Sequence, residues 1–189
     1  MDTKTLFGVL LVAGIVGGFS INSYFMNNET IEDNIIDVEV GNEAPNFTIT
    51  DTEGNSFNLS DFENDKVVVL EFMNMGCGSC HNFEKNVLKS YCNNTTMPED
   101  VKVISLTQTE NEDKDKLEER AEDKNWAYAL GSEEMTDAFG ADRSPSIVII
   151  DKDGMITFSE SGSMTKAELE EKINEALEWV FGSIITLKK

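Results

Sequence analysis

The feature that most constrains the fold is an almost unbroken apolar run, Val67 to Phe72, with the tetrapeptide Cys77-Gly78-Ser79-Cys80 soon after it. Apolar side chains at successive positions predict a strand that is buried on both faces of a sheet. The apolar residues after the tetrapeptide recur at helical spacing, namely Phe83, Val87, Leu88 and Tyr91. This spacing predicts an amphipathic helix that begins near Cys77. We therefore expect the two cysteines where a buried strand ends and a helix begins.

Strands and helices are predicted to alternate along the rest of the chain, which is typical of an α/β layered domain. Before the apolar run, alternating residues predict a hairpin of two strands, Phe47–Ile49 and Phe57–Leu59, around a glycine-containing turn. The later expected elements are strands at Val101–Leu106, Ile147–Ile150 and Met155–Phe158, and helices at Glu112–Lys124, Glu133–Phe139 and Thr165–Phe181. Capping-box patterns mark two of the helix starts: Thr109 with Glu112, and Thr165 with Glu168.

A Cys-x-x-Cys pair at the start of a helix indicates redox chemistry. Unpaired backbone N–H groups and the helix dipole favour a thiolate on the first cysteine, Cys77. A thiolate attacks a disulfide, and a second thiol then resolves the mixed disulfide. The sequence therefore predicts Cys77 as the nucleophile and Cys80 as the resolving cysteine. The third cysteine, Cys92, would lie about 18 Å further along the helix, and we interpret it as a small buried apolar side chain.

Two other uses of the cysteine pair need to be weighed. The chain has three cysteines and one histidine, too few for a zinc site built from two cysteine pairs or from several histidines. With His81, the string Cys77-x-x-Cys80-His81 matches the attachment motif of c-type haem, so a haem-binding electron-transfer protein is the alternative function. The buried strand just before the pair favours thiol chemistry. We expect no metal, and no cofactor other than a redox-active Cys77–Cys80 disulfide.

Two motifs in this order resemble a known family. The first runs from Ala44-Pro45-x-Phe47 through Asp51-x-x-Gly54 to the apolar run and the cysteine pair. The second is Ser144-Pro145, followed by an apolar strand and the turn Asp151-x-Asp153-Gly154. Over about residues 41–180 the chain resembles the membrane-anchored thiol–disulfide oxidoreductases of the thioredoxin-like TlpA/ResA type. The resemblance implies a thioredoxin-like α/β fold: a central mixed β-sheet flanked by helices, with an N-terminal β-hairpin extension and an N-terminal transmembrane helix.

The same resemblance implies roles for single residues. Pro145 would follow a cis peptide bond and face the cysteine pair. Glu71 stands where relatives have a buried acid that exchanges protons with the resolving cysteine, which would explain a carboxyl group inside an apolar run. The implied catalytic residues are Cys77, Cys80, Glu71 and Pro145. The implied substrate-binding residues are Ser144, which would offer backbone groups to a bound peptide, with Gly76, Gly78 and Ser79.

The chain departs from the family pattern beside the pair. Gly76 stands where relatives usually have tryptophan, and His81 stands where they usually have a basic residue. Both positions bear on redox potential and on the choice of partner. Peroxiredoxins share the fold and the Ala-Pro-x-Phe opening, but they need a threonine three residues before the peroxidatic cysteine. Asn74 occupies that position, so a peroxiredoxin-like peroxidase is the most distant of the three functions.

The N-terminus predicts a membrane anchor. An uncharged apolar run from Thr5 to Ile21 continues through Tyr24-Phe25-Met26 and reaches about 22 residues, enough to span a bilayer as a helix. A cleaved signal peptide is the alternative, although the run offers only a poor cleavage site. Lys4 favours a cytoplasmic N-terminus and an extracytoplasmic catalytic domain. The expected parts are an anchor at 1–26, a polar tether at 27–40, a thioredoxin-like domain at 41–182 and a C-terminal tail at 183–189.

The charge of the chain limits its partners. It has 15 basic and 36 acidic residues, for a net charge of −21. Such a surface repels nucleic acid and anionic lipid headgroups, so we expect no nucleic-acid partner. The expected partners are the thiols or disulfides of exported proteins, a membrane or soluble redox partner that recycles the pair, and the membrane itself through the N-terminal helix. The predicted function is thiol–disulfide exchange outside the cytoplasm.

Overall fold

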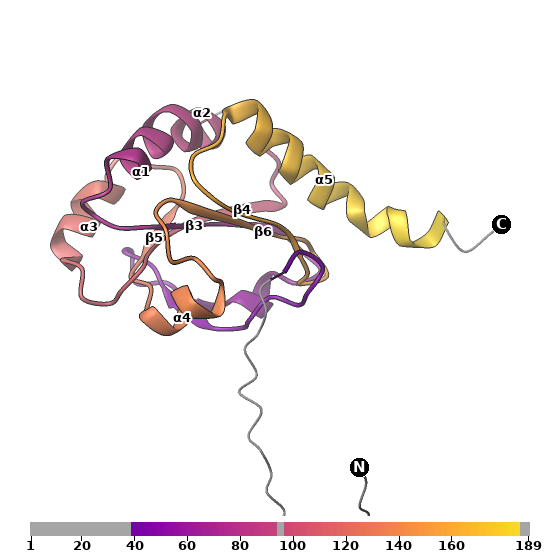
Figure 1. Ribbon diagram of the computed structural model, residues 1–189, viewed down its shortest axis with the longest axis horizontal. Coiled ribbons are helices and arrows are strands. Elements are labelled where there is room, and N and C mark those ends of the chain that lie inside the picture. The colour runs from indigo at the N-terminus through magenta and orange to yellow at the C-terminus, as the bar shows by residue number, and fades with distance from the viewer. Residues whose placement is uncertain (1–38, 94–96, 186–189) are drawn as a thin grey trace, which may run out of the picture. The chain divides into compact units, whose positions relative to one another are not determined.

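The computed structural model describes residues 39–93 and 97–185, whose elements are shown in Figure 1. The strands are β1 (Thr48–Thr50), β2 (Ser56–Asn58), β3 (Val67–Met73), β4 (Val101–Thr107), β5 (Ala127–Ala129), β6 (Ser146–Ile150) and β7 (Ile156–Ser161). The helices are η1 (Leu59–Phe62), α1 (Gly78–Phe83), η2 (Glu84–Leu88), α2 (Lys89–Cys92), α3 (Lys114–Ala121), α4 (Glu133–Ala138) and α5 (Lys166–Ile185). The predicted anchor at 1–26 and most of the tether lie outside the described residues. Within the two described ranges, no helix is both long and apolar enough to cross a membrane.

Strand β3 is the middle strand of a five-stranded sheet with the order β5-β4-β3-β6-β7. It pairs in parallel with β4 and antiparallel with β6, so the sheet is mixed. Every residue of β3 is buried, as the apolar run predicts. A strand buried in this way needs cover on both faces. Figure 1 shows α1, α2 and α5 on one side of the sheet and α4 on the other, which confirms the predicted sheet flanked by helices.

Alternate residues of β3 pack into two different core clusters, because successive side chains of a strand point to opposite faces. Val69 and Met73 belong to a cluster with Cys80 and with apolar residues of α2, α3 and α5. Leu70 belongs to the second cluster, which includes residues of the β1–β2 hairpin and the segment after α4. Glu71 alternates with Leu70, and its side chain therefore lies on the same face as Cys80.

The N-terminal segment is joined to the main sheet at two places. Strands β1 and β2 pair antiparallel, with Ile49 opposite Phe57. Isolated bridges connect Asp51 to Ala129 and Glu43 to Met155. Ala129 belongs to β5, a strand of three residues that the sequence patterns did not predict.

The helix that follows Cys77 contains a π-helical turn, η2, between α1 and α2. Its buried positions include Cys80, Glu84, Leu88 and Cys92, which recur every four residues. In a regular α-helix of 3.6 residues per turn, Cys92 would be rotated by about 120° from Cys80. The π turn of η2 has more residues per turn and so reduces this rotation, which lets both ends of the helix face the sheet. The sequence predicted the helix but not its π turn.

Helix α3 begins two residues later than predicted. Its N-cap residue is Asp113, whose side chain accepts a hydrogen bond from the backbone N–H of Lys116. Thr109 Oγ1 accepts a hydrogen bond from the N–H of Asn111 at 3.0 Å. The predicted capping box of Thr109 and Glu112 is therefore wrong, because the Glu112 carboxylate binds a backbone group in a different loop.

Helix α5 begins with the predicted capping box. The Thr165 N–H donates to Glu168 Oε2 at 2.7 Å, and the Glu168 N–H donates to Thr165 Oγ1 at 3.3 Å. Leu169, Ile173 and Ala176 are buried, which confirms these members of its predicted inner face.

A buried ion pair links α3 to η2. Arg120 Nη2 lies 2.8 Å from Glu84 Oε1, and Arg120 Nε donates to both oxygens of the same carboxylate. The two side chains are only 11% and 2% exposed. Removing one partner of such a pair leaves the other charge buried and uncompensated. The pair therefore fixes α3 against the helix that carries the cysteines.

We expect Arg120→Met to lower the free energy of unfolding by about 3–5 kcal/mol, because the Glu84 carboxylate would stay buried without its partner. Urea denaturation measures this loss. Lys114→Met is the matched control, since it removes the same kind of charge from an exposed pair with Glu118 in the same helix. The control variant should unfold at nearly the wild-type urea concentration. Equal losses in the two variants would show that the ion pair has no special role.

Candidate active site

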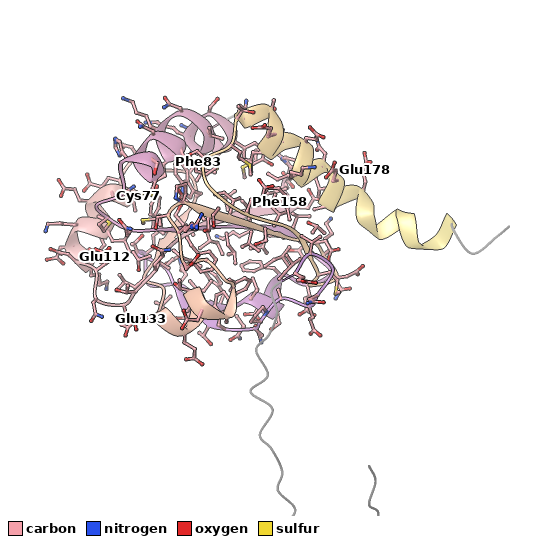
Figure 2. All side chains as sticks on the ribbon, viewed as in Figure 1. Cys77, Phe83, Glu112, Glu133, Phe158 and Glu178 are labelled. Carbon is pink, nitrogen blue, oxygen red and sulfur yellow. A yellow bond between two sulfur atoms is a disulfide. The ribbon has the colours of Figure 1, made fainter. Side chains whose placement is uncertain are left out.

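The cysteine pair forms a disulfide with an S–S distance of 2.05 Å, and Figure 2 shows Cys77 at the start of the helix that carries Phe83. Cys77 is the N-cap residue of α1, and the Cys80 N–H donates to its sulfur at 3.0 Å. The Ser79 hydroxyl lies 3.2 Å from the same sulfur. Cys77 is half-buried, whereas Cys80 is completely buried. Cys77 is therefore the cysteine that another protein can reach.

The loop before the disulfide is held by its backbone. The Met75 N–H donates to Glu112 Oε1 at 3.1 Å, and the Met75 carbonyl accepts from Arg120 Nη1 at 3.2 Å. The same guanidinium binds Glu84 in η2. One arginine thus connects the chain before Cys77 to the helix after it, and this fixes the position of the pair relative to the helix.

The Ser144–Pro145 peptide bond is cis, as the family resemblance implies. The Ser144 side chain is bonded to residues from two other loops. Asn74 Nδ2 donates to Ser144 Oγ at 3.2 Å, and Ser144 Oγ donates to Gln108 Oε1. Ser79, between the two cysteines, donates to the Ser144 carbonyl at 3.5 Å. These bonds hold the cis-proline loop beside the disulfide.

Glu71 is completely buried in β3, on the face of the sheet that packs against Cys80. Its Oε2 accepts a hydrogen bond of 2.5 Å from Ser105, which lies opposite it on β4. Burial raises the pKa of Glu71 well above its usual value, and the nearby carboxylate of Glu84 raises it further. The Ser105 hydrogen bond and the charge of Arg120 lower the pKa but do not offset burial. Glu71 therefore keeps its proton to a higher pH than an exposed glutamate does.

The other residues named from the sequence lie around the pair or away from it. Gly76, Gly78 and Ser79 are exposed next to Cys77, and His81 is exposed in the first turn of α1. Cys92 is a free thiol buried at the far end of the helix, as predicted. Burial raises the pKa of the Cys92 thiol to about 12.

The sequence profile of the Redoxin family matches residues 39–177. The chain belongs to the Redoxin family. The matched residues include the disulfide, Glu71 and the cis-proline loop, so the site described above lies wholly inside the Redoxin domain.

Redoxin-family relatives cover most of the chain. The thiol-disulfide oxidoreductase ResA of Bacillus cereus is 29% identical over 171 residues, which is 88% of this chain and 91% of that protein. ResA of Bacillus subtilis is 24% identical over 169 residues, covering 88% of this chain and 89% of that protein. These relatives are of the TlpA/ResA type that the sequence motifs resemble.

Solved structures show the same fold. The thioredoxin domain of a thiol-disulfide oxidoreductase from Bacteroides vulgatus has a TM-score of 0.59 at 24% identity, covering 72% of this chain and 99% of that domain. An exposed lipoprotein thioredoxin from Streptococcus pneumoniae has a TM-score of 0.58 at 18% identity, covering 69% of this chain and 99% of that one. The predicted thioredoxin-like fold is thereby confirmed.

Several polar residues of the site were not found from the sequence. Glu84 and Arg120 form the buried ion pair, and Glu112 holds the loop before Cys77. The available signal was the position of Glu84, four residues after Cys80 on the apolar face of the predicted helix. A carboxyl group at such a position needs a buried partner. The sequence does not show that Arg120, on another helix, supplies it.

The raised pKa of Glu71 predicts how stability changes with pH. Below the ordinary pKa of about 4.5 the carboxyl group is neutral in both the folded and the unfolded chain. Between that pH and the raised pKa of the folded chain, the unfolded chain has released this proton and the folded chain has not. In this window the free energy of unfolding falls by up to about 1.4 kcal/mol per pH unit. The Glu71→Gln variant lacks this loss, and its stability relative to wild type should rise with pH. Urea denaturation of both oxidised proteins from about pH 4.5 to about pH 8 tests this. A constant difference between them would show that the pKa of Glu71 is ordinary.

Proposed function

We propose that this Redoxin-family chain catalyses thiol–disulfide exchange with other proteins through Cys77 and Cys80. The observation that carries the proposal is the asymmetry of the disulfide: Cys77 is accessible at a helix N-terminus, and Cys80 is buried beneath it. A helix N-terminus stabilises the thiolate that an attacking cysteine needs. The names of the ResA relatives, thiol-disulfide oxidoreductase, support the same reaction.

The reaction that reduces a substrate disulfide has two steps. The Cys77 thiolate attacks one sulfur of the substrate, forming a mixed disulfide and releasing the other sulfur as a thiolate. Cys80 then loses its proton and attacks the Cys77 sulfur, which forms the Cys77–Cys80 disulfide and releases the second substrate sulfur. Two electrons pass to the substrate. A second redox partner must supply two further electrons to reduce the Cys77–Cys80 disulfide before the next turnover. The same steps in reverse oxidise a substrate dithiol.

Glu71 is the proposed proton acceptor for Cys80 in the second step. Its carboxyl group is buried on the face of the sheet where Cys80 packs, and its pKa is raised by burial. A carboxylate with a raised pKa is a stronger base than an ordinary one, so it can take a proton from a thiol and later return it. When the reaction runs in reverse, Glu71 returns the proton to the Cys80 thiolate as it leaves the disulfide.

The bound protein segment is proposed to lie across Cys77 and the cis-proline loop. Pro145 follows the cis bond, and the backbone carbonyl of Ser144 faces Ser79, one of the two residues between the cysteines. Exposed Gly76, Gly78 and Ser79 leave room for an extended peptide around the accessible sulfur.

The proposed redox group is the disulfide itself, with no further cofactor. The thiols that would attach a haem to Cys77-x-x-Cys80-His81 are joined to each other in this structure. A visible absorption spectrum of the purified chain separates the two possibilities, because a covalently bound haem has intense bands that a disulfide lacks.

We also propose that residues 1–26 anchor the domain on the outer side of the cytoplasmic membrane. The apolar run from Thr5 is long enough to span a bilayer, and Lys4 favours a cytoplasmic N-terminus. The substrates would then be the thiols or disulfides of exported proteins, in a compartment where disulfides persist.

Trapping experiments test the order of the two cysteines. Cys80→Ser should accumulate mixed disulfides with partner proteins through Cys77, because the resolving thiol is missing. Cys77→Ser should form none, and Cys92→Ser should behave as wild type because Cys92 is buried. Non-reducing electrophoresis detects the mixed disulfides. If Cys77→Ser traps partners and Cys80→Ser does not, the roles of the two cysteines are reversed.

The role of Glu71 predicts a kinetic defect. Glu71→Gln should slow the resolution of the mixed disulfide at neutral pH by about 10²-fold or more, the usual contribution of a general base. Stopped-flow measurement of the release of the second substrate thiol gives this rate. Circular dichroism serves as the control for folding. A variant that keeps the wild-type rate across a pH series would remove Glu71 from the mechanism.

The anchor predicts a membrane-bound protein. The full-length chain should sediment with membranes, and a chain that lacks residues 1–26 should be soluble and active. Protease added to intact cells should digest the domain, because the anchor would place it outside the cytoplasm. A mature N-terminus near Ser20 in a soluble fraction would show cleavage, and a protected domain would reverse the orientation.

A further inference from the structure

A chain of buried hydrogen bonds ends at Glu71. The indole Nε1 of Trp126 donates to Ser105 Oγ at 3.0 Å, and Ser105 Oγ donates to Glu71 Oε2 at 2.5 Å. Glu71 and Ser105 are completely buried, and Trp126 is 9% exposed. The other carboxyl oxygen, Oε1, is buried with no hydrogen-bond partner among the described residues. The two oxygens of this carboxyl group are therefore not equivalent.

The direction of the chain follows from its first member. An indole N–H can only donate, so the Ser105 oxygen must accept the bond from Trp126. The one hydrogen of the serine hydroxyl is then free to be donated, and Glu71 Oε2 is the acceptor that it meets. Oε2 therefore accepts, and a proton carried by neutral Glu71 belongs on Oε1.

The opposite arrangement satisfies fewer groups. Suppose instead that Oε2 carried the proton and donated it to Ser105. The serine hydrogen would then have no acceptor, because the described side-chain partners of Ser105 are Trp126, which only donates, and Glu71, which would be donating. Oε1 would be without a partner as well. That arrangement leaves two buried polar groups unsatisfied, whereas a proton on Oε1 leaves one, and each such group is costly.

We propose that Trp126 and Ser105 are positioning residues of the redox site: they make Oε2 of Glu71 a hydrogen-bond acceptor and leave Oε1 as the oxygen that exchanges a proton with Cys80. This inference rests on the proposed role of Glu71. It assigns a function to an indole and a hydroxyl whose described side-chain hydrogen bonds reach Glu71 and each other, not the cysteines. It also explains why a carboxyl oxygen is buried without a partner, since that oxygen gains one only when the disulfide opens.

Other ionisable groups face Glu71 from the elements packed around it. Glu84 from η2 and Arg120 from α3 act on it as opposite charges, and they also bind each other. Cys92 from α2 and Tyr128 from β5 are buried thiol and phenol groups that interact with its charge. Burial raises the pKa of each of these two groups. Neither therefore titrates near neutral pH.

The test compares the pH dependence of resolution in a set of full-length variants, with oxidised glutathione as the substrate. Ser105→Ala removes the bond that favours the Glu71 carboxylate, so the midpoint of the pH–rate profile should move to higher pH. Loss of one hydrogen bond corresponds to a rate about two- to tenfold slower below the midpoint. Trp126→Phe should move the profile in the same direction, because Ser105 would be free to accept from Oε2. Ser105→Thr keeps the hydroxyl and should restore the wild-type profile.

The same substitutions in a Glu71→Gln background separate positioning from general structure. If Ser105 and Trp126 act through Glu71, Ser105→Ala and Trp126→Phe should change nothing further in that background. The inference is overturned if Ser105→Ala and Trp126→Phe shift the pH–rate profile equally with and without Glu71. It is also overturned if Glu71→Gln is slow but neither substitution shifts the profile of the wild-type protein. If Glu71→Gln is as fast as wild type, the proposed role of Glu71 fails first, and the inference fails with it.

Infrared spectroscopy of the oxidised protein gives a readout that does not depend on turnover or on Trp126→Phe being stable. The carbonyl stretch of the neutral Glu71 carboxyl is the band that disappears in Glu71→Gln. In Ser105→Ala this band should move to higher wavenumber, because the Oε2 carbonyl loses its hydrogen bond. A band that stays in place in Ser105→Ala would show that Oε2 is not the accepting oxygen and would overturn the assignment.

Discussion

In the layer between β3 and α1, the carboxyl group of Glu71 is buried on the face of the sheet that Cys80 packs against. A charged carboxylate is costly there, and the surrounding polar groups make the position tolerable. Ser105 supplies a hydrogen bond, and Arg120 supplies a positive charge that is already matched by Glu84. Burial remains the largest influence on Glu71. The domain therefore holds, on the side of the sheet where the proposed resolving cysteine packs, a carboxyl group whose pKa is raised by burial.

The direction of the strands explains how the site is assembled. Because β3 and β4 are parallel and β6 runs antiparallel to β3, the ends of the first two and the start of β6 lie at one edge of the sheet. The loops at this edge carry the disulfide, Gln108 and the cis proline. The hydrogen bond between Asn74 and Ser144 connects the loop after β3 to the loop before β6. The hydrogen bond between Ser144 and Gln108 connects that loop to the one after β4. The cysteine pair is thus positioned by three segments that are far apart in the sequence.

Local patterns predicted the parts of this structure that depend on local forces. The strand at Val67–Phe72, the helix after Cys77 and the cap of α5 follow from apolar spacing and from side-chain hydrogen bonds to nearby backbone. The capping box at Thr109 was wrong because Glu112 binds a backbone N–H in a distant loop, which no local pattern shows. The π turn was missed because the sequence does not show which side chains of this helix are buried. Only the structure shows that Cys80, Glu84, Leu88 and Cys92, spaced four residues apart, are all buried. The cis proline and the proposed role of Glu71 came only from the family resemblance.

The burial of Cys92 has a consequence for disulfide isomers. Three cysteines allow three pairings, and repeated exchange at Cys77 gives a chain many opportunities to settle in a wrong one. Only a thiolate takes part in exchange, and the Cys92 thiol, with a pKa of about 12, almost never forms one. The Cys92 side chain is also buried in the core, which limits the access of other disulfides to its sulfur. The folded domain can therefore open and close one disulfide repeatedly without scrambling, although a third cysteine lies on the same helix.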